Sequence, residues 1–352
     1  MSISQTTDAP APNHSIYKAA RKLATSLAVI LTTLLGLLVI TFVVGRMVPA
    51  DPVIAVIGDQ ADQATYDRVY KEMGLDRPVY VQFAHYLGNI TRLDFGQSNI
   101  TKQPVLGDLA RVFPATLELA TFAILIGASL GIPLGVAAAV HKGTWVDHVA
   151  RIVGLLGYST PIFWLGTIVI LLFYAHFGLI PPGGRIYVYN EGIVQARTNS
   201  ILVDSLLGGH WDVFRSAIHH LIAPAVILGY AAMAYLSRMT RSFMLEQLHQ
   251  EYILTARAKG LGKRPIIWRH AFRNIRVQLL TVVALAYCGL LDGTVLIETV
   301  FAWPGLGQYL TSALFFADMN AVLGSVFLIG LISIAINFLS DIVYRFIDPR
   351  TR

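Results

Sequence analysis

Charged residues are scarce in this sequence: Asp, Glu, Lys and Arg make up only 14% of its 352 residues, whereas 55% are hydrophobic. A soluble globular domain has about 25% charged residues. The composition therefore excludes an ordinary soluble protein and predicts that lipid surrounds most of the chain.

Cysteine is almost absent, because the chain contains only Cys288. One cysteine excludes a disulfide framework within the chain, and its position inside an apolar run favours a plain packing role. The histidines follow no HExxH pattern and no Cys/His ligand spacing, so no metal site is predicted. There is also no G-x-S-x-G motif, which leaves a membrane hydrolase without support.

Long apolar runs are present instead, and a helix of about 20 apolar residues crosses a bilayer. The first run follows Lys18, Arg21 and Lys22 and ends without a small-x-small cleavage site, so a retained anchor helix is predicted rather than a cleaved signal. The fold class is therefore predicted to be an all-α integral membrane protein with six transmembrane helices. The six runs lie near 23–45, 115–140, 152–180, 219–240, 277–302 and 321–344.

The distribution of Lys and Arg predicts the orientation of these helices. With the N-terminus inside, the basic stretch from Arg238 to Arg276 and the two chain ends face the cytoplasm, as the positive-inside rule requires. The arrangement is N-in and C-in. The net charge of +6 is then explained by orientation and by lipid headgroups, so membrane lipid and not nucleic acid is the expected partner of the basic residues.

The loops divide the chain into five regions. The segment before the second run mixes Asp, Pro, Gly and short apolar stretches, which predicts broken helices in a small folded lobe. The predicted regions are a disordered cytoplasmic tail (1–15), a first transmembrane helix (16–45), an extracytoplasmic loop lobe (46–112), a core of five transmembrane helices (113–348) and a cytoplasmic tail (349–352).

Small residues in the second run predict a helix-packing surface. Gly127, Gly131 and Gly135 recur at intervals of four and form one smooth face that a neighbouring backbone can approach closely. Pro133 in the same segment predicts a kink, which is tolerated where a neighbour or a water satisfies the freed carbonyl. Two interpretations of the glycine face remain open at this point: packing within the chain and contact with a partner subunit.

The stretch EYILTARAKGLGKRPIIWRHAFRN (251–274) lies between two apolar runs on the predicted cytoplasmic side. Its first part is a short helix that Gly260 and Gly262 end before Pro265. Small side chains at its surface suit insertion into a groove of another protein. An amphipathic helix that lies on anionic lipid is the alternative, and the residues alone do not choose between them.

The same stretch resembles the cytoplasmic loop of ATP-binding-cassette importer permeases of the dipeptide, oligopeptide and nickel group. The resemblance extends over nearly the whole chain, in the family's order. Further segments that resemble the family are MGLDRPVYVQFAHYLGNITRLDFGQS (73–98), FPATLELA (113–120), STPIFWLGTIVILLFY (159–174), PPGG (181–184) and IETVFAWPGLGQYL (297–310). This resemblance implies the type I importer permease architecture in the inner membrane of a bacterium.

In that family the loop forms a coupling helix, here about 251–262, that docks into a nucleotide-binding subunit. The resemblance implies two permease chains of different sequence, two ATPase subunits and an extracytoplasmic solute-binding protein. This chain is expected to hold no cofactor, with ATP and Mg bound by the ATPase; GLGKRP is no Walker A motif, because Arg257 stands where the first glycine is required. The expected coupling contacts are Glu251, Tyr252, Ala256, Arg257, Ala258, Lys259 and Gly260.

Ionisable residues inside membrane spans are costly and each needs an explanation. Glu118 and Asp341 lie near span ends, where hydration or helix capping is expected. Asp292 stands where the family commonly has a small residue, and it is a candidate for the translocation pathway or for pairing with a neighbouring span. Glu298 has two open interpretations, structural hydrogen bonding and pathway lining.

The predicted function is that of a permease subunit that moves di- or oligopeptides by alternating access. The same machinery with nickel or another small solute is the first alternative. A self-sufficient secondary transporter is a further alternative, but the chain has no evident inverted repeat. A membrane enzyme has no catalytic constellation to support it.

Overall fold

The chain consists of helices in the computed structural model, which describes residues 14–47, 52–58 and 61–347. In these ranges the one β-type pairing is an isolated antiparallel bridge between Gln97 and Pro104. The prediction of an all-α fold is therefore confirmed. The two predicted tails lie outside the described residues, apart from the last two positions of the N-terminal one.

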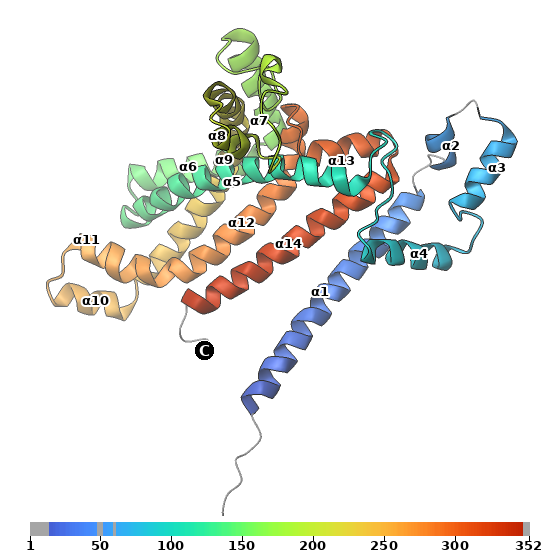
Figure 1. Cartoon of the computed structure of the whole chain (residues 1–352). Helices are drawn as coiled ribbons and strands as arrows, with labels where there is room; N and C mark the ends of the chain where they lie inside the picture. Colours follow the sequence, from blue (N-terminus) through green and yellow to red (C-terminus); the bar gives the residue numbers. More distant parts are fainter. Residues whose placement is uncertain (1–13, 48–51, 59–60, 348–352) are drawn as a thin grey trace, which may run out of the picture.

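The N-terminal part consists of one long helix followed by three short ones (Figure 1). Helix α1 spans His14–Met47, and α2 (Pro52–Ile57), α3 (Gln63–Glu72) and α4 (Val79–Thr91) follow it in the predicted lobe. Helix α1 packs against the last helix, α14 (Met319–Ile347). This pairing brings the first and the last helix of the chain together.

Three long helices form the centre of the molecule. Helices α5 (Val105–Val140) and α9 (Trp211–Leu248) pack along each other, and α12 (Phe272–Val300) lies against both. Helix α5 begins eight residues before the predicted boundary at 113. Pro104 precedes it with a φ of −57°, which suits a helix start, and the charged residues of its first turns had hidden its beginning from a search for apolar runs.

The third apolar run is not one straight helix, which corrects the prediction for 152–180. It contains α6 (Trp145–Ser159) and then α7 (Ile162–Val169) with the π-helix η1 (Ile170–His176), and the two parts are bent by 97°. Pro161 has no N–H to donate, and it disfavours the helical conformation for the residue before it. Thr160 accordingly has an extended backbone.

In the described part of the chain, four helices are long and apolar enough to cross a membrane, and a fifth is obtained if the bent pair is one span. The stretch Ala28–Val43 of α1 is a shorter apolar segment. The count of six spans and their orientation stay predictions.

Shorter elements lie at the two ends of α9. The chain enters α9 from α8 and leaves it toward α10, so these two helices lie at opposite ends of the bundle (Figure 1). Before α9 lie η2 (Val188–Asn190) and α8 (Ile201–Leu207), and after it α10 (Glu251–Ala258), α11 (Lys263–Pro265) and the π-helix η3 (Ile266–Ala271). The short helix α13 (Leu306–Phe315) follows α12 and packs against it.

Candidate functional site: the outer face of helix α10 and the exposed side of helix α12

Helix α10 is short and is well defined at both ends. Glu251 lies in its first turn and Arg257 in its last turn, so each charge opposes the partial charge of the nearer helix end. Gly260 follows with a φ of +78°, a conformation that other residues adopt only with strain. The glycine therefore ends the helix and turns the chain toward α11.

One side of α10 is part of the protein's own core. Ile253 is fully buried and Ala256 is only 6% exposed. They belong to a buried apolar cluster that joins α10 to η3 and to the ends of α5, α9 and α12. The remaining members of this cluster are Val136, Ala139, Met244, Ile266, Ala271, Ile275 and Leu279.

The opposite side of α10 is exposed. Leu254 is 59% exposed, although leucine usually lies inside a protein. Ala258 is exposed one turn further along, and Leu261, just after the helix, is 40% exposed. We call Leu254, Ala258 and Leu261 the α10 apolar face. Its two leucines were not identified from the sequence, because the sequence of so short a helix does not show which side is buried and which is exposed.

The structure divides the predicted coupling residues into two groups. Ala256 faces the core and anchors the helix in the buried cluster, so its side chain is not on the exposed surface of α10. Tyr252 is half-buried, and its hydroxyl donates a hydrogen bond of 2.9 Å to Gln247 Oε1. The exposed members are Glu251, Arg257, Ala258, Lys259 and Gly260.

Helix α12 has one exposed side that no other described helix covers. From Gln278 to the end of the helix, the exposed positions are separated by seven, four, three, four and three residues, which places them on a single helical face. These positions are Gln278, Leu285, Gly289, Asp292, Leu296 and Thr299. Asp292 is thus an exposed carboxylate within an otherwise weakly polar face, and it forms no ion pair in the described part of the chain.

Glu298 occupies a different environment from Asp292. It is fully buried, and its carboxylate accepts hydrogen bonds from Thr116 Oγ1 at 2.6 Å and from Gly307 N at 2.6 Å. Gln308 N donates a third, at 3.1 Å. These contacts fix the start of α13 to α5 and α12. They support the interpretation as a structural hydrogen-bonding residue and give pathway lining no support.

The predicted glycine face of α5 packs within the chain. A Cβ on Gly131 would lie 2.8 Å from Met233 O, and a Cβ on Gly135 would lie 2.5 Å from Ser237 O. At Gly127 it would lie 2.6 Å from the Cβ of Ala232. All three neighbours belong to α9, so the glycines allow the two helices to approach closely.

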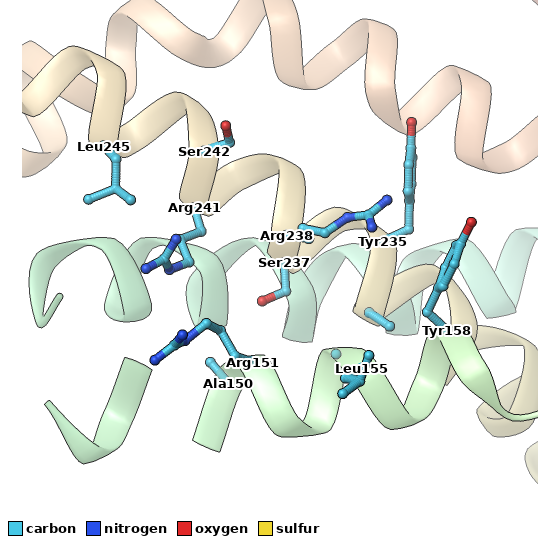
Figure 2. A pocket seen from close by; sticks show the side chains of 12 residues that line it. Ala150, Arg151, Leu155, Tyr158, Tyr235, Ser237, Arg238, Arg241, Ser242 and Leu245 are labelled. Atoms are coloured by element: carbon cyan, nitrogen blue, oxygen red, sulfur yellow. The ribbon is translucent and has the colours of Figure 1, made fainter. Parts of the chain in front are cut away.

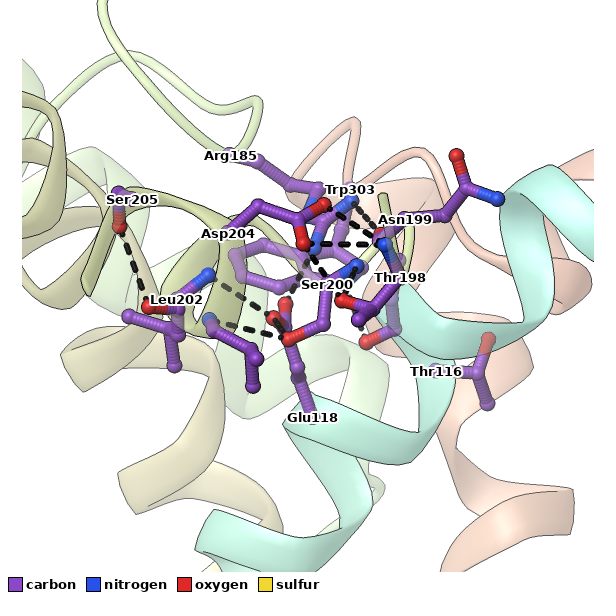
Figure 3. A network of polar contacts seen from close by, with 12 residues as sticks. Thr116, Glu118, Arg185, Thr198, Asn199, Ser200, Leu202, Asp204, Ser205 and Trp303 are labelled. Atoms are coloured by element: carbon purple, nitrogen blue, oxygen red, sulfur yellow. Dashed lines mark hydrogen bonds and ion pairs between the residues drawn. The ribbon is translucent and has the colours of Figure 1, made fainter. Parts of the chain in front are cut away.

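Glu118 joins the loop after η1 to the helix bundle (Figure 3). Its carboxylate forms a salt bridge with Arg185, and it accepts a hydrogen bond of 3.1 Å from Leu202 N in the first turn of α8. Arg185 also lies over the ring of Trp303, at 5.7 Å from its centroid. Of the two roles expected for Glu118, hydration and helix capping, the bond to Leu202 N is a capping contact, although the capped helix is α8 and not the helix that carries Glu118.

Asp204 stabilises the same loop. The carboxylate is buried, which disfavours its charge, but hydrogen bonds from Thr198 and from Arg197 N outweigh this cost. The pKa of Asp204 is therefore lowered from the usual value of 3.8. Within the described ranges, no group of three His, Cys, Asp or Glu side chains is placed to hold a metal ion.

Comparison with known proteins identifies the family. Residues 131–352 match the family model "Binding-protein-dependent transport system inner membrane component", and residues 20–120 match the model of the N-terminal part of such membrane components. A chain of the MetNI methionine ABC transporter in an inward-facing conformation shares the fold, with a TM-score of 0.50 and 19% identity over 68% of this chain and 96% of that chain.

Curated relatives match almost the full length. The probable D,D-dipeptide transport system permease protein DdpB of Escherichia coli (strain K12) is 42% identical over 90% of this chain and 92% of the relative. The di/tripeptide transport system permease protein DppB of Pseudomonas aeruginosa (strain UCBPP-PA14) is 38% identical over 94% and 98%. The resemblance seen in the sequence is confirmed: the chain belongs to the family of binding-protein-dependent transport system inner membrane components, as a multi-pass permease subunit of an ABC importer in the cytoplasmic membrane.

Proposed function

We propose that this chain forms one half of the membrane pathway of a peptide importer and moves di- or oligopeptides by alternating access. The observation that carries the proposal is the similarity over 90% or more of the chain to permeases named for dipeptide transport. A substrate such as nickel is the alternative, and a binding assay on the cognate solute-binding protein with a dipeptide and with Ni²⁺ would decide between them.

The proposed assembly contains this chain, a homologous second permease, two ATPase subunits and an extracytoplasmic solute-binding protein. Family membership supports ATPase and binding-protein partners, and the pairing with a different second permease is our inference. ATP and Mg are bound by the ATPase in this proposal, while this chain binds no cofactor.

We propose that the α10 apolar face inserts into a groove of the ATPase. Because Ile253 and Ala256 are held in the same cluster as Met244 of α9 and Ile275 of α12, a displacement of α10 would move the ends of both long helices. This arrangement supports a mechanical link between ATP-driven closure of the ATPase pair and reopening of the membrane pathway.

We also propose six membrane crossings with both chain ends in the cytoplasm. The single native cysteine makes this testable by replacing Cys288 with Ala and adding one cysteine elsewhere. A membrane-impermeant maleimide added to intact cells should label Ala196→Cys and leave Ala258→Cys unlabelled. Labelling of Ala258→Cys from outside would overturn the orientation.

The coupling proposal is tested by Ala258→Glu in the complete transporter reconstituted in liposomes. A carboxylate at this exposed helical position causes no strain in this chain, but it would be desolvated without a partner in an apolar groove. We expect peptide uptake to fall at least about tenfold, while the chain remains in the membrane and the ATPase keeps its basal hydrolysis.

Ala196→Glu, an exposed position in the loop between η2 and α8, is the matched control and should transport normally. Gly260→Glu is expected to uncouple transport as well, but the positive φ of Gly260 adds backbone strain to the effect. Normal ATP-driven uptake by Ala258→Glu would show that the α10 apolar face does not insert into the ATPase.

A further inference from the structure

A cavity of about 420 Å³ lies between α6 and α9, toward the end of the bundle that carries α10 (Figure 2). This volume falls within the roughly 300–1,000 Å³ of small-molecule pockets. None of its lining residues belongs to the α10 apolar face or to the exposed side of α12. The residues that line it are Ala150, Arg151, Gly154, Leu155, Tyr158, Ala234, Tyr235, Ser237, Arg238, Arg241, Ser242 and Leu245.

The lining is basic and includes no acidic side chain. Of its three arginines, Arg241 is neutralised by the buried Asp147, whose two carboxylate oxygens accept hydrogen bonds from it at 2.7 and 2.9 Å. Arg151 lies further from this carboxylate, at 3.7 Å, and its side chain is 52% exposed. Arg238 forms no ion pair in the described part of the chain. The cavity therefore retains positive charge that this chain does not balance.

The guanidinium groups lie at two places along the cavity (Figure 2). Arg151 and Arg241 lie near each other, and Arg238 lies toward Tyr158, 5.1 Å from the centroid of its ring. Stacking on an aromatic ring holds a guanidinium in place, and its planar fork of donors matches the oxygens of a phosphate group. This geometry suits an anion with several oxygen acceptors.

The surroundings of the cavity are apolar. On α6, Ile152, Leu155 and Leu156 are between 56% and 65% exposed. Helix α6 is the first part of the bent apolar pair that satisfies the criteria for a membrane span. Lipid acyl chains would therefore lie beside an anion that is bound here. This position favours an amphipathic ligand over a freely soluble one.

We propose that this cavity binds the phosphate headgroup of an anionic phospholipid from the leaflet on the α10 side, with the acyl chains lying over α6. Basic pockets between membrane helices on the cytoplasmic side recognise such headgroups. The proposal depends on α6 lying in the membrane and not on the identity of the transported solute. If the site is occupied, the lipid composition of the membrane acts on α9, the helix that leads into α10.

Native mass spectrometry of the purified full-length chain tests this site with phosphatidylglycerol and phosphatidylcholine as probes. We expect preferential retention of phosphatidylglycerol. The double variant Arg151→Gln with Arg238→Gln should weaken its binding at least about tenfold, because two charge-assisted hydrogen-bonding groups are lost. Both side chains are exposed, so this variant keeps the pair between the buried Asp147 and the half-buried Arg241 and should keep its fold.

The matched control is Arg92→Gln with Arg197→Gln, two exposed arginines in other segments, and it should bind phosphatidylglycerol normally. The double variant Arg151→Lys with Arg238→Lys should retain part of the affinity for phosphatidylglycerol. It keeps both positive charges but loses the planar set of guanidinium donors. Equal retention of both lipids, or unchanged binding by the glutamine variant, would overturn the proposal. Displacement of phosphatidylglycerol by a dipeptide would overturn it too and would assign the arginines to a peptide carboxylate.

Discussion

Thr116 and Glu298 are 182 positions apart in the sequence, yet the hydroxyl of Thr116 donates a 2.6 Å hydrogen bond to the Glu298 carboxylate inside the bundle. The other carboxylate oxygen accepts from the backbone of Gly307 and Gln308. A buried side chain of α12 thereby holds α5 and the start of α13 together.

Substitution of Glu298 by Ala should destabilise the protein strongly. Three donors would lose their acceptor, and two of them, Thr116 Oγ1 and Gly307 N, are buried. Each buried unsatisfied group costs about 1–3 kcal/mol. We expect a clearly lower temperature of thermal unfolding for the purified chain in detergent. Glu191→Ala removes an exposed carboxylate from a loop and is the matched control. If both variants unfold at the same temperature, the contacts of Glu298 contribute nothing to stability.

The contact between α5 and α9 predicts opposite effects for two Gly→Ala substitutions on one helix. Gly135→Ala would place a Cβ 2.5 Å from Ser237 O and should cost about 1–3 kcal/mol of unfolding free energy. Gly107→Ala meets nothing within 4 Å and should be neutral or stabilising by up to about 1 kcal/mol. Denaturant titration of both variants measures the difference, and equal effects would show that the helices have room to separate.

The loop before α8 should lose protection in acid. The pKa of Asp204 is lowered by folding, so its carboxylate contributes stability that is complete above the usual pKa of 3.8 and declines as the pH falls toward the folded pKa. Hydrogen exchange of residues 197–204, corrected for intrinsic rates, should show protection at about pH 6 that declines as the pH falls below 3.8.

Two variants separate this carboxylate from the general effect of acid. Asp204→Asn should already reduce the protection of the loop at neutral pH and remove most of its dependence on acid. Asp212→Asn, an exposed carboxylate at the start of α9, should leave the profile unchanged. An unaltered profile in Asp204→Asn would assign the transition to another group.

Asp292 is the residue to test for contact with the transported solute. If its exposed carboxylate faces the pathway and meets the amino group of a peptide, Asp292→Asn should raise the KM for peptides with a free N-terminus about tenfold. Peptides with a blocked N-terminus should be unaffected. Uptake assays in the reconstituted transporter measure this, with Asp76→Asn as the control. Unchanged uptake and substrate range would remove the only reason for placing Asp292 in the pathway.

The all-α architecture was predictable from the sequence because lipid requires long apolar helices, and composition alone reveals them. The bend in the third run was predictable in principle, since Thr160-Pro161 is a local signal against a continuous helix. The starts of α5 and α9 were not, because charged or polar residues occupy their first turns outside the apolar runs.

The contacts of the site were only partly predictable. Small residues on α5 indicated a close helix contact, but the sequence does not say which helix makes it, since a smooth face fits many partners. The partners of Glu298 and Glu118 are distant in sequence and depend on the folded arrangement. The burial of Ala256 could not be predicted either, because the orientation of a two-turn helix is set by the cluster beneath it.

The anchoring of α10 restricts how the chain length can vary on this side of the protein. One residue inserted between Leu248 and Ile253 would rotate the helix by about 100° relative to its anchors and carry Leu254 away from its outward position. Homologous chains should therefore keep the spacing from α9 to α10 constant, while the loop segment 191–196, which precedes the donors to Asp204, is free to change in length.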